Sequence, residues 1–214
     1  MFDNLWVEKY RPKKLDDFCI SETSGFKTFL KKCKDNNEIP NLLLVGNPGI
    51  GKTTIAKIIV NELLECDHLY INASDENGID TIRSKVTSYA RTKSLYDIKI
   101  IILDECDGLT QDGQRALRNV MEEYSAITRF VLTANYKHRI IPALQSRCQT
   151  FDINHDKGPI VDRLIHISHE ECISCDTDDI RKIVENNFPD IRKTINVFQK
   201  SIVGDSLVIQ KDDD

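Results

Sequence analysis

One stretch constrains the fold of this chain more than any other: the aliphatic run LLLV at 42–45, followed by GNPGIGKTT at 46–54. It matches the pattern Gly-x-x-x-x-Gly-Lys-Thr, in which a strand leads into a phosphate-binding loop and the loop into a helix. Glycines let backbone N–H groups turn toward phosphate oxygens, and the helix N-terminus adds a positive dipole. The alternative is a glycine-rich turn that binds nothing, and the flanking strand and helix weigh against it. The sequence therefore predicts a nucleoside triphosphate site, most simply for ATP.

The predicted loop supplies most of the nucleotide contacts. Lys52 is expected to neutralise the β and γ phosphates, and the Thr53 hydroxyl to ligate Mg²⁺. The loop residues expected around the phosphates are Gly46, Asn47, Pro48, Gly49, Ile50, Gly51, Lys52, Thr53 and Thr54. ATP and Mg²⁺ are thus the predicted substrate and cofactor, with hydrolysis to ADP and phosphate as the predicted reaction.

Polar side chains follow two further apolar runs. Asp104 and Glu105 end KIIILDE, where a buried parallel sheet presents residues at its carboxyl edge. Asp104 suits the outer shell of Mg²⁺, and Glu105 is placed to orient or deprotonate the attacking water. Asn135, at the end of RFVLTAN, could position the same water, although asparagine there is equally typical of a turn. An acidic pair often merely begins a solvated loop, but the phosphate-binding pattern upstream favours a catalytic role.

Apolar runs alternate with helical patterns across the first 150 residues. The predicted strands are 42–45, 68–72, 99–104, 129–134 and 149–153. The predicted helices of this part are 25–34, 52–64, 79–91, 111–123 and 138–146. Continuous hydrophobicity suits strands buried on both faces, as in a parallel sheet covered by helices. We therefore predict an α/β domain over 1–154, with three αβα layers and a parallel five-stranded sheet.

The pattern changes after Ile153, where strand-like runs give way to helical ones. The predicted helices here are 156–173, 176–187 and 190–203. Pro189 suits the first turn of the last of these helices and disfavours helix in Phe188 before it. We predict a small all-helical domain over 155–214.

Composition limits the compartment and the partners. Seven cysteines, an odd number without a paired framework, favour a reducing compartment with free thiols. No apolar run approaches the roughly 20 residues that span a membrane, and the first residues lack the apolar centre of a secretory signal. With a formal net charge of −5, any DNA contact must come from a local cationic patch, or from helix N-termini and backbone amides. An intracellular protein is expected, in the nucleus if eukaryotic and in the cytoplasm if prokaryotic or from a phage-infected cell.

Seven stretches carry a family resemblance. They are WVEKYRPKKLDDF (6–18), GNPGIGKTT (46–54), INASDENGID (71–80), LDECDGLTQDGQRALRNVMEEYS (103–125), LTANY (132–136), LQSRCQTFDI (144–153) and FPDIRKTIN (188–196). In this order they resemble the AAA+ ATPase subunits of sliding-clamp loaders, specifically the small subunits of replication factor C and their phage counterparts. The triplet Ser146-Arg147-Cys148 is the most diagnostic part of the resemblance. It implies an AAA+ P-loop fold with a helical lid, and ATP-dependent loading of the polymerase clamp onto primer–template DNA, with hydrolysis triggering release.

The resemblance also implies roles for individual positions. Asn135 matches the sensor asparagine, Arg147 the arginine finger that reaches ATP on a neighbouring subunit, and Arg192 the second sensor arginine on the lid. Taken singly, either arginine would be a surface helix charge. The residues that fall in the family's N-terminal nucleotide-contacting segment, near the adenine, are Glu8, Lys9, Tyr10, Arg11 and Pro12. The positions expected to bind the nucleotide here are Val7, Tyr10, Arg11 and Pro12. Arg83, and with less support Lys85, is expected to contact DNA phosphates; a solvated cationic helix face is the alternative.

Gln114 and Arg118 match positions that link DNA sensing to the ATP site. The implied partners are other subunits in a ring, with Arg147 acting in trans, the sliding clamp and primer–template DNA, and no membrane. Two features depart from the family. Cys106 stands where alanine or phenylalanine is usual. The 214 residues stop after the lid, where family members usually continue into a helical collar domain. Cysteine is small and apolar enough to fit, so catalysis is expected to survive.

Two other functions stay open. One is another AAA+ DNA-processing ATPase, such as a helicase loader or a branch-migration motor, which shares Lys52 and Glu105 but does not predict Ser146-Arg147-Cys148. The other is a scaffold subunit that binds nucleotide without turnover. The intact catalytic set speaks against the scaffold.

A further pattern suggests zinc, because His166, His169, Cys172 and Cys175 recur every three residues. On an α-helix each step of three falls about 60° short of a full turn, so the four positions sweep about 180° of the surface. They cannot converge on one metal unless the helix breaks, and a second CxxC or HxxxH pair is missing. We expect core or surface helix residues here.

Overall fold

The computed structural model describes residues 5–20, 25–92, 94, 96 and 98–208. Its centre is a five-stranded parallel sheet with the strand order β2-β3-β4-β1-β5. The strands are β1 (Leu42–Val45), β2 (Asp67–Asn72), β3 (Lys99–Asp104), β4 (Thr128–Ala134) and β5 (Gln149–Asp152). All five predicted strands are confirmed, with ends that differ by no more than one residue.

Alternate side chains of the central strands enter two separate cores. Leu42 and Leu44 of β1 belong to one hydrophobic cluster, whereas Leu43 and Val45 belong to another. Strand β3 divides in the same way. Because successive side chains of a strand point to opposite faces, a sheet covered on both sides needs unbroken apolar runs. This is the physical reason why the strands could be predicted.

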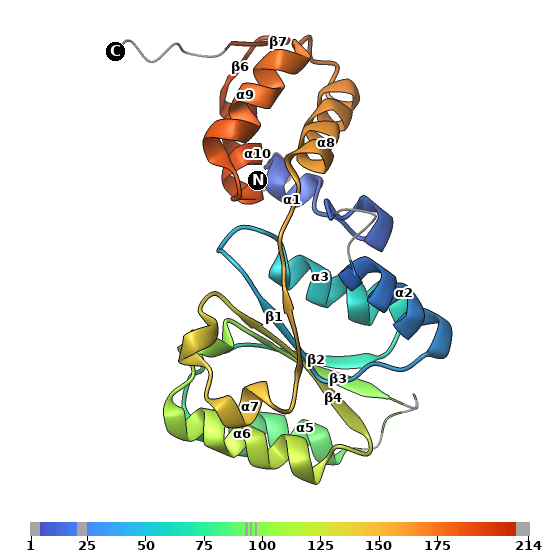
Figure 1. Cartoon of the computed structure of the whole chain (residues 1–214), viewed down its shortest axis with the longest axis vertical. Coiled ribbons are helices and arrows are strands. Elements are labelled where there is room, and N and C mark those ends of the chain that lie inside the picture. Colours follow the sequence, from blue (N-terminus) through green and yellow to red (C-terminus); the bar gives the residue numbers. More distant parts are fainter. Residues whose placement is uncertain (1–4, 21–24, 93, 95, 97, 209–214) are drawn as a thin grey trace.

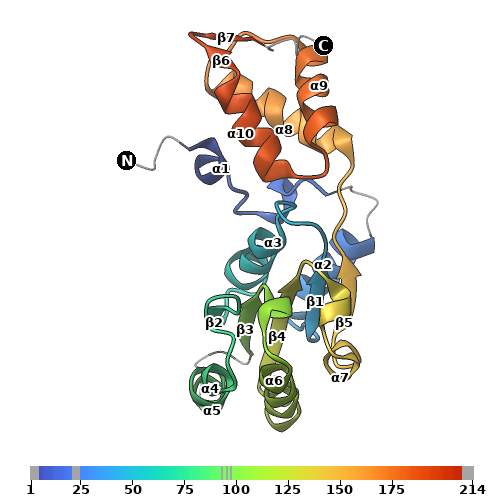
Figure 2. The same ribbon diagram turned by 90° about the vertical axis from the view of Figure 1, so that its left-hand side faces the viewer.

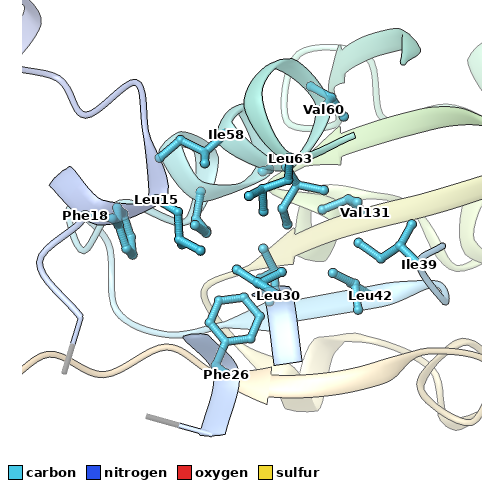
Figure 3. Close-up of a cluster of buried hydrophobic side chains, with 14 of the residues drawn as sticks. Leu15, Phe18, Phe26, Leu30, Ile39, Leu42, Ile58, Val60, Leu63 and Val131 are labelled. Atoms are coloured by element: carbon cyan, nitrogen blue, oxygen red, sulfur yellow. The ribbon is translucent and has the colours of Figure 1, made fainter. Parts of the chain in front are cut away.

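Helices cover both faces of the sheet, which gives three layers (Figures 1 and 2). On one face lie α2 (Gly25–Asn36), α3 (Lys52–Ile58) and a π-helical continuation (Ile59–Leu63). On the other face lie α4 (Ile79–Thr81), a π-helical segment (Ile82–Val86), α5 (Thr87–Arg91), α6 (Gln111–Glu123) and α7 (Pro142–Gln145). In the first core, Leu15 and Phe18 of the N-terminal segment join Leu30 of α2 and Ile58 of α3 (Figure 3). Burying one such side chain contributes about 1.5–3 kcal/mol to folding.

Three further helices lie beyond the carboxyl ends of the strands (Figure 1). They are α8 (Lys157–Glu170), α9 (Thr177–Asn187) and α10 (Ile191–Lys200). The short N-terminal helix α1 (Trp6–Lys9) packs with them in a third hydrophobic cluster. There the rings of Trp6 and Phe198 have centroids 5.6 Å apart, and the Trp6 backbone N–H donates to Gln199. The helices α1 and α10, far apart in the sequence, therefore pack against each other beyond the carboxyl ends of the strands.

Two helix predictions near the end of the chain are corrected by the structure. The predicted helix 190–203 ends at Lys200, because β6 (Ile202–Val203) and β7 (Ser206–Leu207) pair as a small antiparallel hairpin. The predicted helix 156–173 ends at Glu170, and Cys172 then adopts a left-handed conformation with φ 55°. The segment after residue 154 is therefore helical with a short hairpin, not all-helical.

A third correction concerns 138–146. Lys137–Arg139 form a single 3-10 turn, and α7 begins only at Pro142. The residue before a proline disfavours the helical region, and Ile141 is accordingly extended at ψ 143°. The other predicted helices are present, two of them with π-helical turns.

The division into units 1–154 and 155–214 stays a prediction. Within the described ranges, every helix is too short or too polar to cross a lipid bilayer.

Candidate active site

A cavity of about 920 Å³, part of it open to solvent, lies at the carboxyl ends of β1, β3 and β4. The predicted site residues that line it are Val7, Tyr10, Arg11, Pro12, Pro48, Gly49, Ile50, Gly51, Lys52, Thr53, Thr54, Asp104, Glu105, Asn135 and Arg192. Gly46 and Asn47 lie outside this lining and contact Lys52 through their carbonyl oxygens.

The loop after β1 requires glycine at two positions. Gly49 and Gly51 have φ of 78° and 91°, in the left-handed region that other residues rarely adopt. A Cβ atom on Gly49 would lie 2.0 Å from Oδ1 of Asp190, at the start of α10. The Gly49 carbonyl also accepts a hydrogen bond of 3.2 Å from the Arg192 backbone N–H. The loop therefore reaches the start of α10, as Figure 2 shows.

A Gly49→Ala variant is expected to bind ATP about tenfold more weakly, because a left-handed alanine costs about 1–2 kcal/mol and its Cβ displaces Asp190. Titration with a fluorescent ATP analogue measures this. Gly25→Ala is the matched control, since a Cβ there meets nothing within 4 Å among the residues that the structure describes. Equal affinities of the two variants would show that the loop tolerates the extra methyl group.

Lys52 places a buried positive charge at the cavity. Its side chain is 7% exposed, and Nζ donates at 2.8 Å to the Gly46 carbonyl, the Asn47 carbonyl and Oδ1 of Asn135. Burial lowers the pKa of Lys52, and the nearby Asp104 carboxylate opposes that shift. All three hydrogen-bond partners are neutral oxygens. Because a buried charge is stable only when it is paired, the site fits an anionic ligand such as a phosphate.

Three hydroxyl groups converge on the Asp104 carboxylate. Thr53 Oγ1 lies 2.8 Å from both carboxylate oxygens, Thr133 donates to Oδ1 at 2.6 Å, and Tyr70 donates to Oδ2 at 2.8 Å. Burial, followed by the hydrogen bond to Asp104, raises the pKa of Tyr70, so its hydroxyl remains a donor. Hydroxyl and carboxylate oxygens are the donor set that Mg²⁺ prefers. Thr53 and Asp104 therefore fit the predicted metal.

Glu105 is held in an uncommon backbone conformation, with φ 55° and ψ 42°. Its N–H donates to Thr133 at 2.9 Å, and its carboxylate accepts a hydrogen bond of 2.5 Å from Ser74. The backbone of Asn135 is fixed separately, since its N–H donates to Asp107 at 3.2 Å. Sequence reasoning assigned no role to Ser74 or Asp107, although both lie within recognised motifs.

His155 contacts both the N-terminal segment and the loop after β1 through its two ring nitrogens. One ring nitrogen contacts the Cys19 carbonyl, and the other lies 2.6 Å from the carbonyl of Ile50 in the loop. The imidazole is buried and stands edge-on to Phe18. No sequence motif singled out this histidine.

Arg147 does not line this cavity. It precedes β5, whose first residue Gln149 pairs with Leu42 at the start of β1, whereas the loop follows the end of β1. The Arg147 guanidinium pairs with Glu122 of α6 and donates to the Ala143 carbonyl at 2.7 Å. The structure thus separates Arg147 from the other predicted catalytic residues within one chain.

The predicted DNA contacts lie on another surface. Arg83 lines a groove against α6 together with Arg115 and Asn119. Lys85 forms an ion pair of 2.5 Å with Glu76.

The two positions predicted to link DNA sensing to the ATP site differ in burial. Gln114 is buried; its Nε2 donates to the Arg139 carbonyl at 3.0 Å, and its Oε1 accepts from the Ile141 N–H at 2.8 Å. It therefore ties α6 to the segment that follows Asn135. Arg118 hydrogen-bonds its exposed neighbour Asn119.

The histidine–cysteine series is split by the end of α8. His166 and His169 lie on this helix, and Cys172 and Cys175 follow it. Among the described residues, no three His, Cys, Asp or Glu side chains are grouped to hold a metal ion.

A parallel sheet with a phosphate-binding loop after β1 and an acidic end on β3 defines a P-loop nucleotide-binding protein. Residues 42–154 match the model of one such family, described as AAA, ATPase family associated with various cellular activities. The chain belongs to the AAA family of ATPases.

Two curated relatives are similar over most of this chain. The replication factor C small subunit of Thermofilum pendens is 43% identical over 208 residues, which cover 93% of this chain and 63% of that protein. The replication factor C small subunit of Methanococcus vannielii is 44% identical over 204 residues, which cover 91% of this chain and 63% of that protein. The chain therefore spans less than two thirds of the length of these relatives.

Solved structures share the fold. The RuvB Holliday junction branch migration motor of Thermotoga maritima superposes with a TM-score of 0.75 at 20% identity, over 90% of this chain and 64% of that chain. A point variant of the same Thermotoga maritima protein gives the same TM-score, identity and coverage.

Proposed function

We propose that this chain is an ATPase subunit of a sliding-clamp loader, which opens a ring-shaped polymerase clamp and places it on primer–template DNA. Hydrolysis of ATP then triggers release. The observation that carries the proposal is the separation of Arg147 from a cavity that already holds Lys52, Asp104, Glu105 and Asn135. In the proposed assembly, the Arg147 of a neighbouring subunit brings a further cation to this site. The similarity to replication factor C small subunits supports this reading.

In the proposed reaction, each polar group has a separate task. Lys52 and the N–H groups at the start of α3 bind the phosphate oxygens. Thr53 and Asp104 hold Mg²⁺, which when bound neutralises charge on the phosphates. Glu105 orients the attacking water and accepts its proton, and Asn135 fixes that water from the other side.

The proposed assembly places the remaining residues at contacts between molecules. Arg147 leaves Glu122 and reaches the γ-phosphate on the next subunit, where its planar guanidinium can bond two oxygens. Arg192 contacts ATP in its own chain, from a lid formed by 155–214. Arg83, and Lys85 once released from Glu76, contact phosphates of the primer–template duplex and read no sequence. The partners are other loader subunits, the clamp and DNA, in the compartment where DNA is replicated.

The proposal is tested by ATP hydrolysis of the chain with its partner subunits. Primed DNA and clamp together should raise the rate, because a completed ring aligns Arg147 with the neighbouring site. If they gave no stimulation and a helicase or a four-way junction did, another AAA DNA-processing machine would be the better assignment.

Glu105→Gln should lower turnover by about 10²–10⁴-fold, because the amide keeps the shape of the side chain but accepts no proton. Phosphate release in the assembled complex measures turnover, and a filter assay measures bound ATP, which should not change. Glu185→Gln, on the exposed side of α9, is the control. Comparable turnover in Glu105→Gln and wild type would favour the non-catalytic scaffold.

A further inference from the structure

A tyrosine outside the recognised motifs contacts the acidic end of β3. In the parallel pairing of β2 with β3, Tyr70 lies opposite Ile102, and Asn72 lies opposite Asp104. Tyr70 is therefore the diagonal neighbour of Asp104 on the same face of the sheet, a distance that a long aromatic side chain can span. Its hydroxyl donates to Oδ2 of Asp104 at 2.8 Å.

This hydrogen bond completes a symmetric arrangement around the carboxylate. Oδ1 accepts from Thr133, Oδ2 accepts from Tyr70, and the Thr53 hydroxyl lies 2.8 Å from both oxygens. A carboxylate with a fixed donor on each oxygen cannot rotate without losing one of them. Without Tyr70, the Thr53 hydroxyl would be the only side-chain donor to Oδ2 among the described residues.

Helix α3 holds the tyrosine ring in place. The Lys57 ammonium lies 5.0 Å from the centroid of the Tyr70 ring, within the range of a cation–π contact. Lys57 follows Thr53 by four residues, so both side chains project from the same side of α3. One helix thus presents the Thr53 hydroxyl to Asp104 and also contacts the ring whose hydroxyl donates to Asp104.

We propose that Tyr70 is a positioning residue for the Mg²⁺ site, where its hydroxyl fixes the orientation of Asp104 relative to Thr53. The inference rests on the proposed nucleotide function. Tyr70 does not line the cavity, so it acts through Asp104 and touches neither nucleotide nor metal. Loss of a hydrogen-bond partner of this kind typically weakens metal binding by about 10–100-fold.

The test is Tyr70→Phe, which removes only the hydroxyl. Binding of a non-hydrolysable ATP analogue is titrated in the whole chain with increasing Mg²⁺, and repeated with excess EDTA. The Mg²⁺ concentration for half-maximal enhancement of binding should rise at least about tenfold. Affinity in EDTA should stay at the wild-type value, because the phosphate loop is untouched.

Tyr89→Phe is the matched control. Within the described part of the chain, the buried Tyr89 hydroxyl has no hydrogen-bond partner, so its removal should leave the Mg²⁺ dependence unchanged. If Tyr70→Phe behaved like Tyr89→Phe, the inference would be wrong. An equal loss of affinity with and without Mg²⁺ would also overturn it, since that pattern indicates a structural role. A wild-type chain that failed to bind the analogue in Mg²⁺ would instead remove the proposed function.

Discussion

Arg147→Ala is expected to reduce DNA- and clamp-stimulated ATP hydrolysis in the assembled complex by about 10³–10⁵-fold. The magnitude is that of an arginine supplied across an interface, where the guanidinium stabilises charge that develops only in the transition state. The affinity of the isolated chain for ATP should not change, because Arg147 does not line the cavity of its own chain. Steady-state hydrolysis and equilibrium binding of a fluorescent analogue separate these two effects.

The fold should tolerate this change. Arg147 is partly exposed and pairs with Glu122, and such surface pairs contribute less than about 1 kcal/mol to stability. Arg181→Ala is the matched control, since Arg181 also forms an exposed pair, with Asp178 on α9. Wild-type stimulated rates from Arg147→Ala would remove the assignment of this residue as the finger.

Lys52→Ala is expected to weaken ATP binding by roughly 100-fold, because charge-assisted hydrogen bonds contribute about 1.5–3 kcal/mol each. The effect should exceed that of the other substitutions within the cavity. Lys52 brings a buried positive charge to the phosphates, and burial lowers its pKa. A bound anion favours the charged form of the lysine and so opposes that shift.

Lys52→Met separates charge from volume, because methionine fills nearly the same space without an ammonium group. Both variants should lose binding alike, as measured by isothermal titration with ATP and Mg²⁺. Retained affinity in Lys52→Met would mean that the side chain only packs the loop. Lys182→Ala, on the exposed side of α9, is the control for general loss of charge.

Most of the sheet could be predicted because its strands face two cores. Unbroken runs such as LLLV at 42–45 are typical of strands buried on both sides, and the glycine spacing indicates the loop that follows. The hairpin of β6 and β7 could not be predicted in this way. Ile202 and Val203 continue the apolar pattern of α10, and only the turn at Gly204, with φ 62°, reverses the chain.

Some residues of the candidate site could be predicted from the sequence and others could not, because only some of them belong to local sequence patterns. Lys52, Thr53 and Asp104 belong to local patterns whose spacing carries their chemistry. Tyr70 and His155 act through contacts with residues far away in sequence, which depend on strand register and on the packing of the N-terminal segment. Arg147 was assigned through the family resemblance alone, and no local pattern would have distinguished it from a surface charge.

The most direct test of a shared active site mixes two inactive variants. Arg147→Ala keeps its own Glu105, and Glu105→Gln keeps its own Arg147. Where the two are neighbours in one assembly, some interfaces combine an intact Glu105 with an intact Arg147 from the next subunit. Native mass spectrometry establishes that both variants are present together, and phosphate release is then measured. A shared site predicts that the mixture recovers ATP hydrolysis; a mixture that assembles but hydrolyses ATP no faster than either variant alone would contradict it.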